Sequence, residues 1–70
     1  MPLTMCRAGD EVTIVRIKGN EDVRHHLIDL GFVENEKVRV ISRLANNLIV
    51  VVKETRVALD EKMANRIMVH

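Results

Sequence analysis

The chain has few aromatic side chains and only one cysteine. It contains one Phe and neither Tyr nor Trp, so Val, Ile, Leu and Met must fill its core. A single cysteine excludes a disulfide within the chain and fits a reducing compartment. Small β-proteins that bind nucleic acid use aromatic platforms and a basic groove, and proline-rich peptides dock on aromatic-lined grooves. The composition therefore argues against both kinds of ligand.

The chain also lacks a charge excess and a long apolar run. Eleven basic and ten acidic residues leave a formal net charge of +1, so no extended field of one sign is expected. The longest apolar run is the five residues Leu48–Val52, whereas a membrane-spanning helix needs roughly 20. The first residues do not follow the pattern of a signal peptide. These features predict one domain over residues 1–70 that works in the cytoplasm.

Groupings typical of catalytic or metal sites are missing. No hydroxyl residue lies in a glycine-flanked elbow, and the three isolated glycines form no phosphate-binding loop. Cys6, His25, His26 and His70 are possible metal ligands. Adjacent histidines on a helix point about 100° apart, however, and there is no Cys-x-x-Cys pair. We predict no enzymatic activity, no cofactor and no specific metal site, with Cys6 as an apolar filler and His25 and His26 as solvated helix residues.

One short helix is predicted before Gly31. Its apolar face has residues at i, i+4 and i+7, with one more side chain widening it: Val23, Leu27, Leu30 and Ile28. Asn20 suits the N-cap, because its side-chain oxygen can accept from amides of the first turn. Gly31 suits the end of the helix, because glycine adopts positive φ without a steric penalty. Phe32, which follows, is interpreted as a core plug.

Five β-rich runs are predicted around this helix: Val12–Ile17, Val38–Ile41, Leu48–Val52, Arg56–Leu59 and Ile67–Val69. The first run changes phase, which indicates a bulge or burial on both faces. The third shows no alternation, so either both of its faces are covered or one is a contact surface.

Turn residues separate these runs. Asn46–Asn47 and Lys53–Glu54 are predicted as hairpin turns, and Asp60 as the cap of a single helical turn through Ala64. Five short strands with one inserted helix predict a mainly β fold, a small and partly open barrel, because closure removes edges that would otherwise seek partners.

Several short motifs, in order along the chain, resemble the FeoA family of ferrous iron transport proteins. They are Pro2-Leu3-Thr4, Gly9, Leu27-x-x-Leu30-Gly31-Phe32, Val38-x-Val40, Val57-Ala58-Leu59, and Ala64 with Ile67 and Val69. The chain departs from the family pattern at two places. Asn35 stands where the family usually has glycine, although it can also adopt positive φ, and Ala45-Asn46-Asn47 replaces a longer hairpin that contains Gly or Pro.

The resemblance implies an SH3-like barrel of five or six strands with the helix inserted after the first strand. It also implies a non-catalytic accessory protein that binds and regulates a FeoB-type ferrous iron permease, whose cytosolic region carries a GTP-binding domain. The protein would lie in the cytoplasm, peripheral to the inner membrane through this partner. Candidate contacts are Arg24, His25 and Asp29 on the outer helix face, with Arg43, Asn46 and Asn47 at the hairpin.

Three alternatives remain open from the sequence. The chain could be an SH3-like interaction domain of the kind attached to metal-dependent repressors. It could be a weak carrier of transition metals that uses Cys6 or the histidines. Exposed strand edges also make self-association through strand pairing conceivable.

Overall fold

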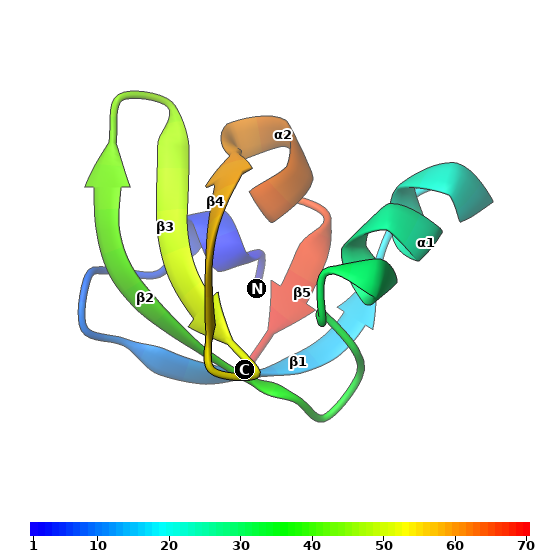
Figure 1. The fold of residues 1–70 in the computed structure, drawn as a ribbon, viewed down its shortest axis with the longest axis horizontal. Coiled ribbons are helices and arrows are strands. Elements are labelled where there is room, and N and C mark those ends of the chain that lie inside the picture. Colours follow the sequence, from blue (N-terminus) through cyan, green and yellow to red (C-terminus); the bar gives the residue numbers. More distant parts are fainter.

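An antiparallel sheet curls around a single core in the computed structural model, which describes residues 1–70 (Figure 1). Its strands are β1 (Glu11–Ile17), β2 (Lys37–Leu44), β3 (Asn47–Val52), β4 (Thr55–Asp60) and β5 (Ile67–Val69). They lie side by side in the order β4-β3-β2-β1-β5. The helical elements are η1 (Leu3–Met5), α1 (Glu21–Asp29) and α2 (Glu61–Ala64). The predicted mainly β, partly open barrel is confirmed, while η1 was not predicted.

Two bulges bend the sheet. The pairing of β1 with β5 shifts register between Ile14 and Arg16, which leaves Val15 exposed and confirms the bulge predicted from the change of phase. A second shift between Val40 and Ser42, in the pairing of β2 with β3, was not predicted. Because a bulge bends a strand and increases its twist, the two together help a five-stranded sheet to curl.

The ends of α1 are fixed as the sequence predicts. The Asn20 side-chain oxygen accepts a hydrogen bond of 2.9 Å from the backbone N–H of Val23. At the other end Gly31 has φ 108°, and its N–H donates to the carbonyl of Ile28 at 2.9 Å. The N–H of Phe32 donates to the carbonyl of Leu27 at 3.0 Å, which completes a Schellman motif.

The core is entirely apolar. It contains no buried polar residue, and Phe32 is its largest fully buried side chain, so the predicted core plug is confirmed. The remaining buried side chains come from every element: Leu3, Cys6, Ile14, Leu27, Val38, Val40, Leu48, Val50, Val52, Leu59, Ala64, Ile67 and Val69. On β3 the residues alternate after all, with Leu48, Val50 and Val52 buried and Ile49 and Val51 half-buried. One face of β3 therefore lines the core, and the other is only partly covered.

The turns differ from expectation at one hairpin. The predicted Asn46–Asn47 turn is wrong by one position, since β2 extends to Leu44, which pairs with Asn47. Ala45 carries the left-handed conformation there, with φ 55°. The predicted turn at Lys53 and Glu54 is confirmed, and both residues have positive φ, 49° and 63°.

Ile28 is also misplaced by the helical pattern. It was expected to widen the apolar face of α1, but it is 41% exposed, and Leu27 is the only fully buried residue of the helix. Val23 and Leu30 are only partly buried. The helix packs on the barrel along a stripe too narrow to include Ile28.

At the far end of the chain Asp60 caps α2 as predicted, accepting from the N–H of Met63 at 2.8 Å.

The left-handed Glu54 offers a test of turn strain. Left-handed geometry costs a residue with a Cβ about 1–2 kcal/mol, and glycine avoids this at an entropic cost of roughly 0.5–1 kcal/mol. Glu54→Gly should therefore raise the free energy of unfolding by about 0.5–1 kcal/mol, measured by urea denaturation. Glu34→Gly is the matched control, because Glu34 is exposed in a turn without positive φ, and it should leave stability unchanged or lower it. Equal destabilisation by both changes would contradict this reading.

Cys6 lies in the core at 4% exposure, as its interpretation as an apolar filler predicts. Burial raises the pKa of its thiol above the ordinary value, and the negative charge of Asp10 adds to the shift. Because the folded state holds this proton more tightly than the unfolded state does, the thiol's contribution to stability is fully present below the ordinary thiol pKa. It is lost as the pH rises through the raised pKa.

We therefore expect the free energy of unfolding to fall more between pH 7 and about pH 10 in the natural chain than in a Cys6→Ala variant. The comparison removes the effect of other groups that titrate in this range, since both proteins carry them. Urea denaturation of the two proteins at both pH values measures the difference. Parallel pH dependences would show that the thiol does not titrate differently in the folded and unfolded states.

Candidate interaction surfaces

Helix α1 projects from the barrel, at the right in Figure 1. Apart from the buried Leu27 and the half-buried Val23, its residues are exposed. Arg24, His25 and Asp29 are among them, so the structure places the first group of predicted contacts on an open helix surface. His25 and His26 are both solvated, as expected. Most residues of the helix are therefore open to solvent.

A small cleft of about 180 Å³ lies beside α1. It is lined by Ile17, Arg24, Ile28, Phe32, Val33 and Glu34. The cleft places the guanidinium-bearing Arg24 next to the exposed apolar side chain of Ile28, one turn further along the helix. The helical pattern alone did not indicate that Ile28 is a surface residue, although its position directly after Leu27 puts it at the border of the apolar face.

The second predicted group lies at the β2–β3 hairpin. Arg43 is already engaged within the chain, since its Nη2 donates to the carbonyl of Thr4 at 2.8 Å and so ties η1 to the hairpin. Asn46 is exposed in the turn, and Asn47 begins β3. The hairpin and α1 lie on opposite sides of the barrel in Figure 1, so the structure does not bring the two groups of predicted contacts together.

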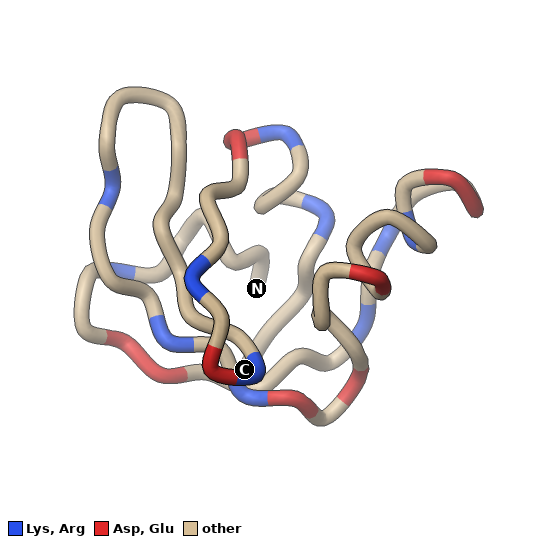
Figure 2. Tube along the Cα trace, viewed as in Figure 1, with Lys and Arg blue, Asp and Glu red and all other residues tan.

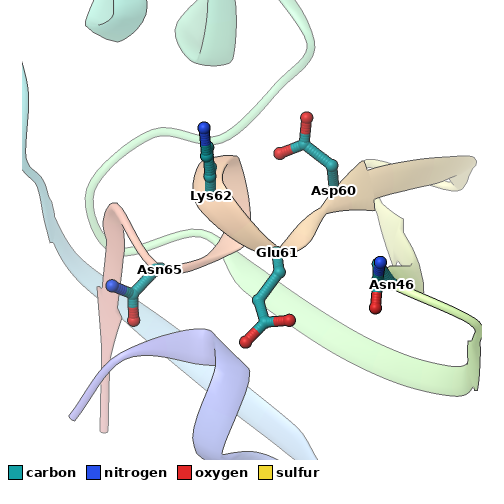
Figure 3. A pocket seen from close by; sticks show the side chains of 5 residues that line it. All are labelled: Asn46, Asp60, Glu61, Lys62 and Asn65. Carbon is teal, nitrogen blue, oxygen red and sulfur yellow. The ribbon is translucent and has the colours of Figure 1, made fainter.

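Asn46 also borders a polar depression of about 640 Å³ between the hairpin and α2, shown in Figure 3. Its other lining residues are Asp60, Glu61, Lys62 and Asn65. Their side chains do not converge, because Asp60 and Lys62 point one way and Glu61 the other (Figure 3). The Asn65 side-chain oxygen already accepts from the Thr4 hydroxyl at 3.1 Å. The depression therefore has no set of polar groups aimed at one ligand.

No group of three or more His, Cys, Asp or Glu side chains is placed to hold a metal ion. The candidate ligands are separated by the fold, with Cys6 buried in the core while His25 and His26 are exposed on α1. A buried, protonated thiol is also a poor ligand, since metals bind the thiolate.

Charges of both signs are interspersed over the strands and α1 (Figure 2). The one salt bridge joins Lys53 to Glu36 at 3.0 Å and lies at the surface. On the outer face of the sheet, the register aligns Glu11, Arg39, Val51 and Arg56 in one row across β1, β2, β3 and β4. Half-buried Val51 thus lies between two arginines. None of the helices is long and apolar enough to cross a membrane.

Solved structures with the same fold include FeoA proteins and a repressor. A crystal structure of an iron uptake regulatory protein, FeoA, is 28% identical, with a TM-score of 0.91 over 99% of this chain and 92% of that one. Stenotrophomonas maltophilia FeoA complexed with zinc, described as a prokaryotic SH3 domain protein, is 28% identical, with a TM-score of 0.88 over 100% and 89%. A manganese-dependent transcriptional repressor is 26% identical, with a TM-score of 0.90, and the match covers 99% of this chain and 40% of the repressor.

A comparison with curated proteins gave no significant match. The model of the FeoA domain, in contrast, matches residues 1–70, the whole length of the chain. The fold matches that of Stenotrophomonas maltophilia FeoA, which is described as an SH3 domain protein, as the resemblance implied. The sequence motifs, the fold and the family match agree, and the chain belongs to the FeoA family.

Proposed function

We propose that this chain is a non-catalytic accessory protein of ferrous iron uptake that binds a FeoB-type permease and regulates it. Family membership supports the coarser role in ferrous iron transport. The observation that carries the proposed binding is that helix α1 projects from the barrel (Figure 1) and that most of its residues are exposed. The protein would act in the cytoplasm and lie at the inner membrane only through its partner.

The α1 surface has the composition of a protein contact. Arg24, His25 and Asp29 supply charge and hydrogen-bonding groups, while Ile28 supplies an apolar anchor at the cleft. Interfaces typically combine an apolar centre with a polar rim, and arginine is enriched in them. We assign the principal contact to this surface, with an apolar side chain of the permease entering the cleft between Ile28 and Val33.

The hairpin surface is the second contact in this proposal. Asn46 and Asn47 present amide groups that can donate and accept hydrogen bonds. Arg43 keeps its bond to the Thr4 carbonyl and positions the hairpin while its exposed side remains available. Because the two groups lie on opposite sides of the barrel, a permease region that touches both would have to reach around the domain.

Calorimetric titration against the cytosolic region of the permease, with and without guanine nucleotide, tests the proposal. Ile28→Asp or Arg24→Glu should weaken binding about tenfold or more, because each places an unfavourable group at the assigned contact. Arg39→Glu is the matched control. It makes the same charge change as Arg24→Glu on an exposed strand residue away from α1, and it should leave affinity within about twofold.

Failure to bind in any nucleotide state, including with full-length permease in detergent, would reject the proposal. Binding that is weakened by Arg39→Glu and untouched by the α1 variants would keep the partner but move the contact to the sheet.

Two alternative functions have to be separated from this proposal. The match to a manganese-dependent repressor favours an interaction domain of that kind as the second candidate. A metal carrier is the third, and a titration with ferrous iron or zinc separates it from the others. We expect at most weak binding that Cys6→Ala and His25→Ala do not change, because the thiol is buried and the histidines are apart from it. Stoichiometric micromolar binding lost in those variants would favour the carrier.

A further inference from the structure

The two edges of the sheet are treated differently. At the β5 edge the N-terminal segment adds a partial strand, in which Pro2 forms a bridge with Met68. The N–H of Val69 donates to the carbonyl of Met1 at 2.7 Å, and the terminal amine of Met1 donates back to the carbonyl of Val69 at 3.0 Å. At the other edge β4 pairs only with β3, and no backbone hydrogen bond from outside the regular elements reaches residues 55–60. β4 is therefore the open edge.

The β3–β4 turn determines which backbone groups of β4 are unpaired. In this two-residue turn, the N–H of Thr55 points toward Val52 on β3. Backbone groups alternate in direction along an antiparallel strand. The N–H and C=O groups of Val57 and Leu59 therefore also point toward β3. The N–H groups of Arg56, Ala58 and Asp60 point to the open side. A strand with outward-facing donors and acceptors is a template for another strand.

The side chains of β4 select the strand that would fit. Arg56, Ala58 and Asp60 lie on the outer face of the sheet, and Val57 and Leu59 on the inner face. In a second copy that runs antiparallel, these outer side chains come in the opposite order, Asp60, Ala58, Arg56. Each charged side chain of one copy then lies opposite a side chain of the other charge in its partner. Neither Arg56 nor Asp60 is in an ion pair within the chain.

We propose that two copies of this chain pair through β4, antiparallel, with the two-fold axis at Ala58. In this register Arg56 of each copy lies opposite Asp60 of the other, and Val57 lies opposite Leu59. Small Ala58 meets its counterpart at the axis. Asp60 keeps Oδ1 on the N–H of Met63, which leaves Oδ2 to meet the arginine. The interaction is isologous and closes at two copies.

Other registers are worse, either because of the side-chain charges or because of the backbone hydrogen bonds. Sliding one copy by two residues along β4 removes both Arg56–Asp60 pairs. Sliding it by four residues brings two Arg56 or two Asp60 side chains face to face, and like charges directly opposite are destabilising. A slip by one residue would set outward-facing backbone groups against groups that already face β3. The pairing centred on Ala58 is therefore the favoured one.

One six-residue strand makes a small interface, so the dimer should exchange rapidly with the monomer. Sedimentation analysis of the purified chain from about 10 μM to about 1 mM should show the mean mass rising toward that of a dimer. Arg56→Glu should abolish the rise, since it places Glu opposite Asp60 twice. Arg39→Glu, in the same row of the sheet but two strands from the edge, should leave the rise unchanged.

A charge exchange tests the register itself. Asp60→Arg alone should also be monomeric, whereas a mixture of the Arg56→Glu and Asp60→Arg variants should form a heterodimer, because each edge then finds the opposite charge. Circular dichroism checks that Asp60→Arg remains folded after the loss of its α2 cap.

If that variant unfolds, disulfide trapping replaces it. In a Cys6→Ala background, Ala58→Cys should crosslink to itself, and Ser42→Cys, on the same sheet row away from the edge, should not.

A chain that stays monomeric at about 1 mM would overturn the inference, as would equal crosslinking of the two cysteine variants. Slowed amide exchange at Arg56 and Ala58 only when the cytosolic region of the permease is present would also overturn it, because the edge would then belong to that partner. The inference does not depend on the proposed permease contact at α1, and either can fail without the other.

Discussion

The insertion of Phe32 into the barrel depends on one left-handed residue. Gly31 turns the chain at the end of α1, so that the backbone N–H of Phe32 donates to the Leu27 carbonyl. The side chains of Phe32 and Leu27 both enter the core. A Cβ at Gly31 would lie 3.3 Å from the Lys53 side chain and would also be strained by its φ of 108°. In a chain with a single aromatic residue, nothing else of that size is available to fill the centre. The helix end therefore anchors α1 and completes the core at the same time.

The same anchoring leaves α1 free to act as a surface. Only Leu27 of the helix is fully buried, so the residues on the outer face of the helix can contact a partner without disturbing the barrel. The strands are constrained differently, because Leu48, Val50 and Val52 must face the core while Ile49 and Val51 face outward. The domain thus combines a rigid β core with two unpartnered features, a projecting helix and the open β4 edge. Both features fit the proposed role of the domain in binding a partner.

Much of the fold could be predicted from local chemistry. Asn20, Gly31 and Asp60 determine helix ends through their own side chains or backbone freedom, so their roles could be inferred from a short stretch of sequence. The β2–β3 turn could not, because β2 extends to Leu44 and the left-handed conformation falls on Ala45 instead of on an asparagine. The exposure of Ile28 was also hidden, since it depends on how narrow the contact between α1 and the barrel is. The contact residues stay predictions, because they depend on the surface of a partner and not on the folding of this chain.

Hydrogen exchange of the full chain, alone and with full-length permease in detergent, tests the account most directly. Amide exchange in so short a helix should be fast in the free chain, because α1 buries little apolar surface. We predict that the permease slows exchange across α1 and the turn around Asn46, while the amides of the sheet interior remain unchanged. Unchanged exchange in α1 in the presence of bound permease would contradict the central claim that this helix is the docking surface.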